Sequence, residues 1–413
     1  MKKDDKQGFG KLVSLREAKK IISNITKEVD DERVSLDKAL HRVLSEDIVS
    51  DIDVPHFRKS AMDGFAVIAS DTFGASNTNS KELKIIDKVI AGIVSKKKLK
   101  KGECIEITTG AAMPEGADAV LMVEYTEKEK DKLVFYKSVA PGDNVIKIGS
   151  DVKKGSLLLK RGTLLDPRLT GVLSSIGKKT ILVKKIPRIS VLSTGNEIIS
   201  ADKELEIGKI YDINSRTLID SIKEMHCIPL DLGVVGDEEE VLKKKIIEGV
   251  EKSDLVIMSG GSSLGSEDLT KEVVQELGEL LVHGIAVKPG KPVIIAKIKG
   301  KAFIGLPGYP TSALSNFHIM VKPVIHSMLG LKEEKNFVEA KLARKIASTI
   351  GRYEFLAVKL ERSGEKDKEE LIAVPVMKGS SAITTMSTAD GFVEIDENTE
   401  VLNKRESVKV SLF

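Results

Sequence analysis

From residue 187 to residue 331, short apolar segments alternate with longer segments in which apolar residues recur every three or four positions. The short segments have the length of buried strands, and the longer ones have the periodicity of amphipathic helices. This alternation predicts an α/β domain with a mostly parallel sheet covered on both faces. The expected strands are 189–193, 229–235, 255–259, 285–288, 293–298 and 302–306, and the expected helices lie near 215–225, 238–251, 268–277 and 311–328.

The flanking segments have other patterns. Ser14 is expected to cap an amphipathic helix that runs to Ile25, and a second helix is expected from Ser35 to Leu44. Residues 70–140 and 332–413 are richer in strand patterns, and the last segment predicts a small all-β domain. The charged runs 96–101 and 127–132 are expected to be solvated loops. Strands are expected near 84–89, 104–107, 119–124, 133–137, 156–159, 337–340, 352–360, 370–376 and 408–413.

One strand-to-helix connection has the composition of an anion site. The apolar segment 255–258 leads into Ser-Gly-Gly-Ser-Ser at 259–263, and Ser-Glu-Asp at 266–268 opens the next helix. Glycines let the backbone approach a ligand, and the helix N-terminus adds free N–H groups and a positive dipole end. The two acids fit if a divalent cation lies between carboxylate and phosphate. An ordinary turn capped by Ser266 explains the same residues equally well.

Charged residues follow several of the expected parallel strands. Ligands of such sheets gather at the carboxyl ends of the strands, and three carboxylates with two lysines there would be costly to leave unpaired. Each residue alone is more often a cap or a surface charge, but an anionic ligand that binds metal would match both signs of charge. The residues expected at this edge are Glu197, Asp237, Ser263, Asp268, Lys288, Lys291 and Ser312.

Composition limits the classes of function. The 413 residues carry 65 basic and 62 acidic side chains, a near-balance that argues against a nucleic-acid binder. The two cysteines are far apart and fit neither a disulfide framework nor a zinc site, so a reducing cytoplasm is expected. The N-terminus has no signal-peptide core, and no apolar run approaches the roughly 20 residues that span a membrane.

Several motifs together resemble the molybdopterin molybdenumtransferases, the MoeA family that includes the gephyrin E domain. The resemblance covers nearly the whole chain, and the order of the motifs makes it specific, whereas each motif alone is weak. The motifs are Ser-Ala-Met-Asp-Gly at 60–64, Thr-Gly-Ala at 109–111, Ser-Thr-Gly-Asn-Glu at 193–197, Ser-Gly-Gly-Ser-Ser-Leu-Gly at 259–265, Lys-Pro-Gly-Lys-Pro at 288–292 and Gly-Leu-Pro-Gly at 305–308.

The resemblance implies a multidomain α/β plus β fold. An elongated linker domain would comprise residues 1–53 and 141–186, with a β-rich domain inserted at 54–140. Residues 187–331 would form the molybdopterin-binding α/β domain, which resembles the adenylyltransferases of the same pathway. Residues 332–413 would form a C-terminal β-barrel. The family's elongated homodimer implies that each site faces the inserted domain of the other chain.

The implied reaction is insertion of molybdate, or of tungstate, which the sequence does not distinguish, into adenylylated molybdopterin. AMP is released, and the reaction requires Mg²⁺. Partners would be small molecules, a second copy of the chain and the pathway adenylyltransferase. Lysine, arginine and hydroxyl donors suit a tetrahedral dianion, and cleavage of a phosphoanhydride needs charge neutralisation more than a nucleophile.

The resemblance also assigns roles to residues. Asp237 and Asp268 would lie around metal and pyrophosphate, Glu197 in the same pocket, and Asp63, Thr109 and Asp151 would approach from the partner subunit. The substrate-binding residues would be Gly260, Gly261, Ser263, Lys288, Lys291, Pro307, Ser312, Arg352 and Ser381.

Two positions depart from the family's pattern. Tyr309 replaces the asparagine of the usual Gly-Leu-Pro-Gly-Asn-Pro loop, and Gly284 stands where some members carry lysine, with His283 beside it. Two other functions stay open. One is adenylylation of molybdopterin, although that enzyme has only the α/β unit. The other is a non-catalytic scaffold as in the gephyrin branch, although this chain lacks the additional domain and long linker expected there.

Overall fold

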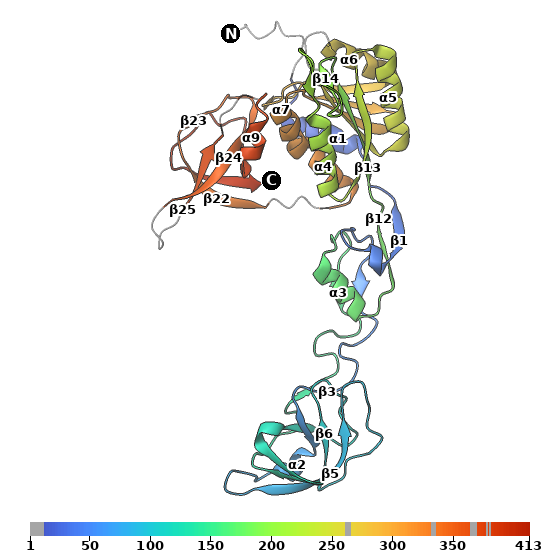
Figure 1. Cartoon of the computed structure of the whole chain (residues 1–413), viewed down its shortest axis with the longest axis vertical. Helices are drawn as coiled ribbons and strands as arrows, with labels where there is room; N and C mark the ends of the chain where they lie inside the picture. Colours follow the sequence, from blue (N-terminus) through green and yellow to red (C-terminus); the bar gives the residue numbers. More distant parts are fainter. Residues whose placement is uncertain (1–11, 261–265, 332–335, 364–369, 377–378, 380) are drawn as a thin grey trace.

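The structure is a computed structural model that describes residues 12–413 except 261–265, 332–335, 364–369, 377–378 and 380, and for residues 266–268 it describes the backbone alone. The molecule is elongated (Figure 1). An α/β unit and a β-barrel lie side by side at one end, a β-rich unit lies at the other, and a narrow linker joins them. Among the described helices, none is both long enough and apolar enough to cross a membrane.

The α/β unit contains a six-stranded sheet in the order β16-β13-β17-β21-β20-β18. The first four strands are parallel, and β20 and β18 continue the sheet antiparallel to their neighbours. Because β13 follows the linker strand β12, the carboxyl ends of the parallel strands face away from the linker (Figure 1). These strands are β13 (Arg188–Thr194), β16 (Ile228–Val235), β17 (Leu255–Gly260), β18 (Gly278–His283), β20 (Ile294–Ile298) and β21 (Lys301–Leu306).

Helices cover both faces of this sheet, as the sequence predicts. On one face of the sheet, a core contains buried residues of α1, α4, the π-helical segment η3 and α8. On the other face, a second core contains buried residues of α5 and α6. Ser14 accepts a hydrogen bond from the N–H of Glu17 (3.2 Å), so the expected cap of the first helix is confirmed. The helices are α1 (Leu15–Ile25), α4 (Asn214–Glu224), α5 (Glu239–Lys252), α6 (Ser266–Leu277), α7 (Pro310–Asn316), η3 (Phe317–Val321) and α8 (Lys322–Met328).

Two expectations for this region are wrong. The segment expected as a strand at 285–288 is reduced to β19 (Val287–Lys288), which pairs with β24 (Tyr353–Ser363) of the barrel and not with the α/β sheet. The sixth strand of the α/β sheet is instead β18, whose half-polar sequence lacks the continuous apolar run of a central strand because it lies at the sheet edge.

The linker corrects a third expectation. No helix starts at Ser35: β1 (Asp31–Ser35) pairs antiparallel with β12 (Thr180–Lys184), and only the short 3₁₀ turn Leu36–Lys38 follows. Of the apolar residues expected on a helix, Leu36, Ala39 and Leu44 instead pack in a small core with α3 (Pro167–Ser175) and with β2 (Ile48–Val49) paired to β11 (Leu157–Leu159). Val43 joins the core of the α/β unit, and Leu40 is exposed. Pairing with a segment about 150 residues away overrides a local helical pattern.

The β-rich unit is a six-stranded sheet in the order β7-β4-β6-β5-β9-β8. The charged run 127–132 is not a loop as expected, because β8 and β9 pair across it as a hairpin and leave its charged side chains exposed. The strands are β4 (Gly64–Val67), β5 (Lys81–Val89), β6 (Glu103–Ile107), β7 (Ala119–Met122), β8 (Thr126–Glu129) and β9 (Lys132–Phe135).

The C-terminal unit is a closed barrel, as expected. Its strands follow the order β24-β25-β22-β28-β26, and pairing of β24 with β26 closes the ring. The sequence did not predict β26 (Gly391–Ile395) or the short helix α9 (Thr384–Thr388). The other strands are β22 (Phe337–Leu342), β25 (Glu370–Pro375) and β28 (Ser407–Leu412).

Candidate functional site

Asp237 lies at the carboxyl edge of the sheet, just after β16, and is held by the turn that follows β13. Its carboxylate accepts hydrogen bonds from the Thr194 hydroxyl (3.3 Å) and from the Asn196 amide (3.1 Å). The Asn196 side-chain oxygen in turn accepts from the Asp237 N–H (3.1 Å). Asn196 therefore fixes the half-buried carboxylate, and a carboxylate held by neutral donors keeps its charge for a ligand.

Two glycines shape this edge. Gly260 ends β17 opposite Thr194 with a φ of +109°, and an added Cβ would lie 2.0 Å from the Thr194 carbonyl oxygen. Gly195 has a φ of +148°, and its missing Cβ would lie 2.9 Å from a carboxylate oxygen of Glu197. Only glycine fits either place, so the chain comes close enough for Glu197 to fold over the turn.

Asp212, just before α4, and Asn214 and Ser215 at its start were not predicted as site residues. Their side chains form hydrogen bonds with the ends of neighbouring strands. The Asn214 amide donates to the Ser259 hydroxyl (2.8 Å) and to the Gly308 carbonyl (2.7 Å). Asp212 accepts from the Ser215 N–H (3.0 Å), as a helix-capping residue does. The feature of the sequence that could have revealed these residues is the polar cluster directly before the expected helix. Asn214 thereby ties the end of β17 to the loop that contains buried Pro307.

Lys288 lies where the α/β unit meets the barrel. Its ammonium is 3.1 Å from Glu354 in a salt bridge, and the Ser348 hydroxyl donates to the other Glu354 oxygen (3.1 Å). Glu354 is only 8% exposed, so the pair holds Lys288 on the barrel side of the edge. Arg352, half-buried, lies in the bend just before β24, and its N–H donates to the Thr349 carbonyl (3.2 Å).

Ser312 and the 288–292 loop are joined through α7. Asn316 donates to the carbonyls of Gly290 (3.2 Å) and Ser312 (2.8 Å), and a Cβ at Gly290 would lie 2.0 Å from the Asn316 amide nitrogen. Ser312 is buried, and Lys291 is half-buried with its carbonyl bonded to the Ile285 N–H (2.9 Å). The loop that carries both lysines is thus fixed against α7.

A contact from α7 reaches the segment with Ser381. The Thr311 hydroxyl donates to the Ala382 carbonyl (3.3 Å), and Ser381 itself is exposed in a turn before α9. The bonded chain from Asp237 to Ala382 therefore joins most of the expected site residues on one edge. Gly261 and Ser263 lie outside the described residues, and Asp268 is described only by its backbone, in the first turn of α6.

Asp63 and Thr109 contact each other but belong to the other end of the molecule (Figure 1). One Asp63 carboxylate oxygen accepts from the Thr109 N–H (2.7 Å) and hydroxyl (3.0 Å). These hydrogen bonds lower the pKa of the exposed Asp63 carboxyl, which therefore stays ionised at neutral pH. Within one chain, this pair is separated from the α/β edge by the linker (Figure 1). Asp151 is exposed, and its N–H donates to the Val54 carbonyl (3.1 Å).

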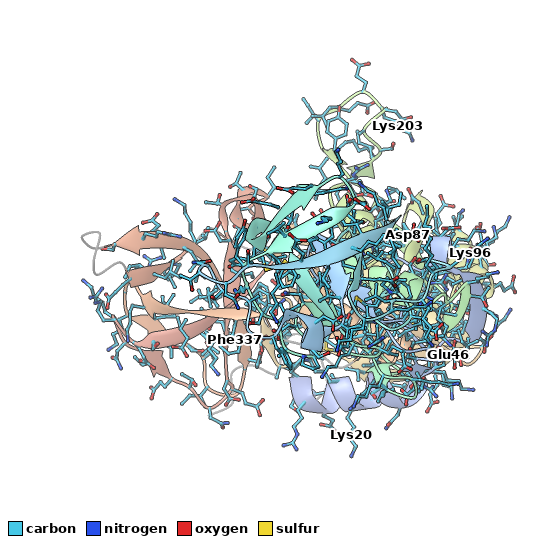
Figure 2. All side chains as sticks on the ribbon, turned by 90° about the horizontal axis from the view of Figure 1, so that it is seen from below. Lys20, Glu46, Asp87, Lys96, Lys203 and Phe337 are labelled. Atoms are coloured by element: carbon cyan, nitrogen blue, oxygen red, sulfur yellow. The ribbon has the colours of Figure 1, made fainter. Side chains whose placement is uncertain are left out.

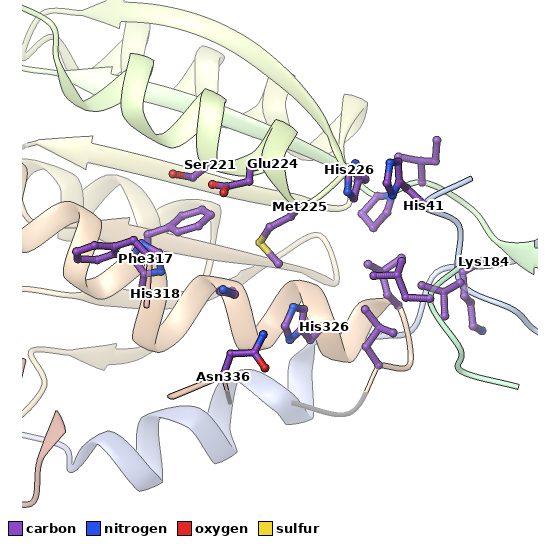
Figure 3. A pocket seen from close by; sticks show the side chains of 18 of the residues that line it. His41, Lys184, Ser221, Glu224, Met225, His226, Phe317, His318, His326 and Asn336 are labelled. Atoms are coloured by element: carbon purple, nitrogen blue, oxygen red, sulfur yellow. The ribbon is translucent and has the colours of Figure 1, made fainter. Parts of the chain in front are cut away.

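Two of the cavities that flank the α/β unit exceed 500 Å³. One of about 720 Å³ lies beside the Asp237 edge, between α4, the open edge of β16 and the turn at Gly195 and Asn196. The other, of about 510 Å³, lies near the opposite edge and is shown in Figure 3. There His41 of the linker stacks on His226 (3.7 Å between centroids), and burial lowers the pKa of His318 to about 4. Only the first cavity adjoins the expected site.

The residues at this edge fit a Mg²⁺ ion that would be bound mainly by the phosphate groups of the substrate and by water, with few ligands from the protein. Among the described side chains, no three of His, Cys, Asp or Glu gather as a metal site. One Asp237 oxygen accepts from Thr194 and the other from Asn196, and each keeps a lone pair for a metal ion. Mg²⁺ commonly takes one or two carboxylates and completes its shell with phosphate and water.

Tyr309 gives a first testable consequence. It is the N-cap residue of α7, 58% exposed, and no side-chain hydrogen bond caps the helix. Tyr309→Asn is expected to raise the free energy of unfolding by about 1 kcal/mol, because asparagine accepts from the first-turn N–H groups. Chemical denaturation would measure it, with Tyr309→Phe as the unchanged control. No gain over Tyr309→Phe would contradict the capping explanation.

Comparisons with known proteins cover almost the whole chain. Residues 13–177 match the model of the MoeA N-terminal region (domain I and II), 190–327 a probable molybdopterin binding domain, and 339–413 the MoeA C-terminal region (domain IV). A putative molybdopterin biosynthesis protein of Methanocaldococcus jannaschii is 35% identical over 97% of this chain and 98% of its own. The molybdopterin molybdenumtransferase of Bacillus subtilis is 33% identical over 97% of this chain and 94% of its own.

A solved structure is similar over the same length. The molybdopterin biosynthesis MoeA protein of Pyrococcus horikoshii is 44% identical, with a TM-score of 0.85 over 97% of this chain and 99% of that one. A second structure of a MoeA protein from that organism is 34% identical, with a TM-score of 0.83 over 98% of this chain and all of that one.

Proposed function

Because the chain belongs to the MoeA family, we propose that it is a molybdopterin molybdenumtransferase, which inserts molybdate or tungstate into adenylylated molybdopterin and releases AMP. The observation that carries this proposal is the hydrogen-bonded edge that runs from Asp237 through Thr194, Ser259 and Asn214 to the Gly308 loop. A phosphorylated ligand at the ends of parallel strands is the arrangement that this fold class favours.

The charges of the edge suit the two substrates. Asp237 and Asp268 would hold Mg²⁺ beside the pyrophosphate, with Glu197 in the same pocket and Gly260, Gly261, Ser263 and Pro307 along the pterin and nucleotide. Lys288, Lys291 and Arg352, with Ser312 and Ser381, would bind the oxyanion. Lys288, Lys291 and Arg352 are cationic, and the Lys288 ammonium is held by Glu354; cationic and hydroxyl donors of this kind suit a tetrahedral dianion.

Mg²⁺, when bound, would neutralise charge that develops on the phosphoanhydride. The chain's own residues orient the ligand. Asn196 and Thr194 hold the Asp237 carboxylate toward the edge, and Glu354 keeps the Lys288 ammonium in place. Preorganised charges of this kind need no rearrangement at the moment of reaction, which is why they accelerate it.

We further propose that the active form is a homodimer in which Asp63 and Thr109 complete the site of the other chain. Support comes from the position of Asp63 and Thr109 at the end of the elongated molecule that lies far from the Asp237 edge of the same chain (Figure 1). The linker also exposes apolar side chains that a partner would cover: Val49 and Leu157 face each other across a strand pair at 40% and 48% exposure, and Leu40 and Leu164 are each 44% exposed.

The expected domain boundaries at residues 53, 140, 186 and 331 remain part of the proposal. They are supported by cores that are largely separate, although α1 packs within the α/β core and so joins that unit in space. A cytoplasmic location, and contact with the adenylyltransferase that supplies the substrate, are also proposed.

The decisive experiment titrates the purified protein, supplied with adenylylated molybdopterin and Mg²⁺, with molybdate and separately with tungstate while AMP is measured. Oxyanion-dependent AMP release that stops when Mg²⁺ is chelated is expected. If ATP is consumed with free molybdopterin and no oxyanion is needed, the protein is an adenylyltransferase instead. If no AMP forms under either condition although the pterin binds, the protein is a non-catalytic scaffold.

A further inference from the structure

A projecting arm stands beside the candidate site. It comprises residues 200–209 between the short strands β14 (Ile198–Ile199) and β15 (Ile210–Tyr211), and Lys203 marks it where it extends beyond the rest of the molecule in Figure 2. Two apolar side chains lie on it without cover, since Leu205 is 54% exposed and Ile207 is fully exposed. Such residues on an extended loop favour contact with another surface.

The arm is anchored to the site itself. The Lys209 ammonium donates to the Asn196 carbonyl (2.8 Å), and the Ile210 N–H donates to the Glu197 carbonyl (2.8 Å). Asn196 in turn holds Asp237. Whatever the arm contacts will therefore lie beside the Asp237 edge.

A second apolar loop stands beside the other half of the proposed site. The loop of residues 90–98 follows β5, and its Ile90, Ile93 and Val94 are 45%, 54% and 70% exposed. The Ala91 N–H donates to the Thr108 hydroxyl (3.2 Å), which places this loop next to Thr109 and hence next to Asp63.

The two elements carry opposite charges. The arm carries three acidic residues and two lysines, with Glu204 and Glu206 on either side of Leu205. The loop ends in Lys96, Lys97 and Lys98, of which Lys98 forms a salt bridge with Glu115. Lys96 is exposed (Figure 2). Apolar tips of opposite charge suit each other, because burial of the apolar groups supplies affinity and the charges select the orientation.

We propose that the arm of one chain packs on the 90–98 loop of a second copy and closes the composite site. This inference rests on the proposed homodimer and adds to it a specific contact. In a two-fold dimer the contact occurs twice, once at each site. It would bring Asp63 and Thr109 to the Asp237 edge and cover the open side of that edge from water.

Crosslinking of two single variants tests the contact. Both native cysteines are buried, and burial raises the pKa of each to about 12, so introduced cysteines react selectively. Ile207→Cys chains mixed with Val94→Cys chains, left to exchange subunits and treated with a short bismaleimide, are expected to give covalent dimers in up to about half of the protein, because random exchange makes about half of the dimers mixed. Because each chain carries only one new cysteine, such a product can only join different chains.

The matched control pairs Ile207→Cys with Phe73→Cys. Phe73 is also an exposed apolar residue of the β-rich unit (51%), but its carbonyl is bonded to Lys81, at the end of β5 opposite the loop. At least tenfold less crosslinking is expected there. Equal yields in both mixtures, from a protein that sediments as a dimer, would overturn the arm contact and leave the homodimer standing. A monomer would overturn both.

Ile207→Asp provides an independent measurement. The side chain is fully exposed in one chain, so the fold is expected to be unchanged. Loss of one buried isoleucine per contact would raise the dimer dissociation constant about tenfold, and the two symmetric contacts together about a hundredfold. Glu206→Lys should also weaken the dimer, and Lys96→Glu in the same chain should restore it. An unchanged dissociation constant for Ile207→Asp would overturn the proposal.

Discussion

Asp237→Asn is expected to lower oxyanion-dependent AMP release by about a hundredfold or more, with the fold intact. The substitution keeps the size of the side chain, and an amide oxygen can still accept from Asn196, so the free energy of unfolding should change by only about 1 kcal/mol. The negative charge is lost, however, and with it a ligand for Mg²⁺ beside the phosphoanhydride. Removal of one preorganised charge typically reduces turnover by this factor.

The measurement is AMP formation against Mg²⁺ concentration, together with a thermal unfolding curve. Asp254→Asn is the matched control: Asp254 is likewise an aspartate of the α/β unit, and it accepts the backbone N–H of Arg188 (2.8 Å), but it lies just before β17, at the opposite edge of the sheet. It should retain full turnover. Asp268→Asn should behave like Asp237→Asn. Normal turnover in either site variant would remove that residue from the metal site.

Mixing two inactive variants is expected to restore about a quarter of the turnover. If Asp63 acts across the dimer, a mixed dimer of Asp63→Ala and Asp237→Asn chains has one doubly altered site and one intact site. Random exchange makes about half of the dimers mixed, and half of their sites are then intact. Each variant alone should be nearly inactive, because Asp63 and Thr109 would complete every site.

The mixture must be refolded, or incubated long enough for subunits to exchange. The control is a mixture of Asp63→Ala chains with Thr109→Ala chains. Those two residues lie on the same half-site, so no mixed dimer of this pair contains an intact site. Recovery in the control as well, or no recovery in the first mixture despite proven exchange, would contradict the cross-subunit assignment.

The regular part of the fold was largely predictable from local pattern. Central strands such as Leu255–Gly260 are buried on both faces, so they read as continuous apolar runs, and α5 and α6 present one apolar face each. The failures have a common cause. Asp31–Ser35 and Val287–Lys288 owe their conformation to partners at 180–184 and 353–354, and no pattern inside a short segment reports a distant partner.

The candidate site was predictable in its residue types but not in its supports. The glycines at 195 and 260 follow strands that the sequence predicts correctly, so their place near one edge could be anticipated. The lysines at 288 and 291 were placed there through an expected strand at 285–288, of which only Val287–Lys288 forms a strand, paired with the barrel. Glu354 was missed, because it looks like any charged residue on a strand until Lys288 is found 3.1 Å away. Asn214 was missed as well, since its partners Ser259 and Gly308 follow it by 45 and 94 residues.

The sequence by itself determined the chemistry of this protein. It set which residue types follow each strand, where only glycine can stand, and the motifs that mark its family. Tertiary structure alone decided their grouping, because hydrogen bonds between loops bring Asp237, Ser259 and Gly308 to one edge. It also set Asp63 and Thr109 apart at the far end of a rigidly paired linker. The physical reason is that side-chain chemistry is local, whereas the distance between two side chains depends on every strand pairing between them.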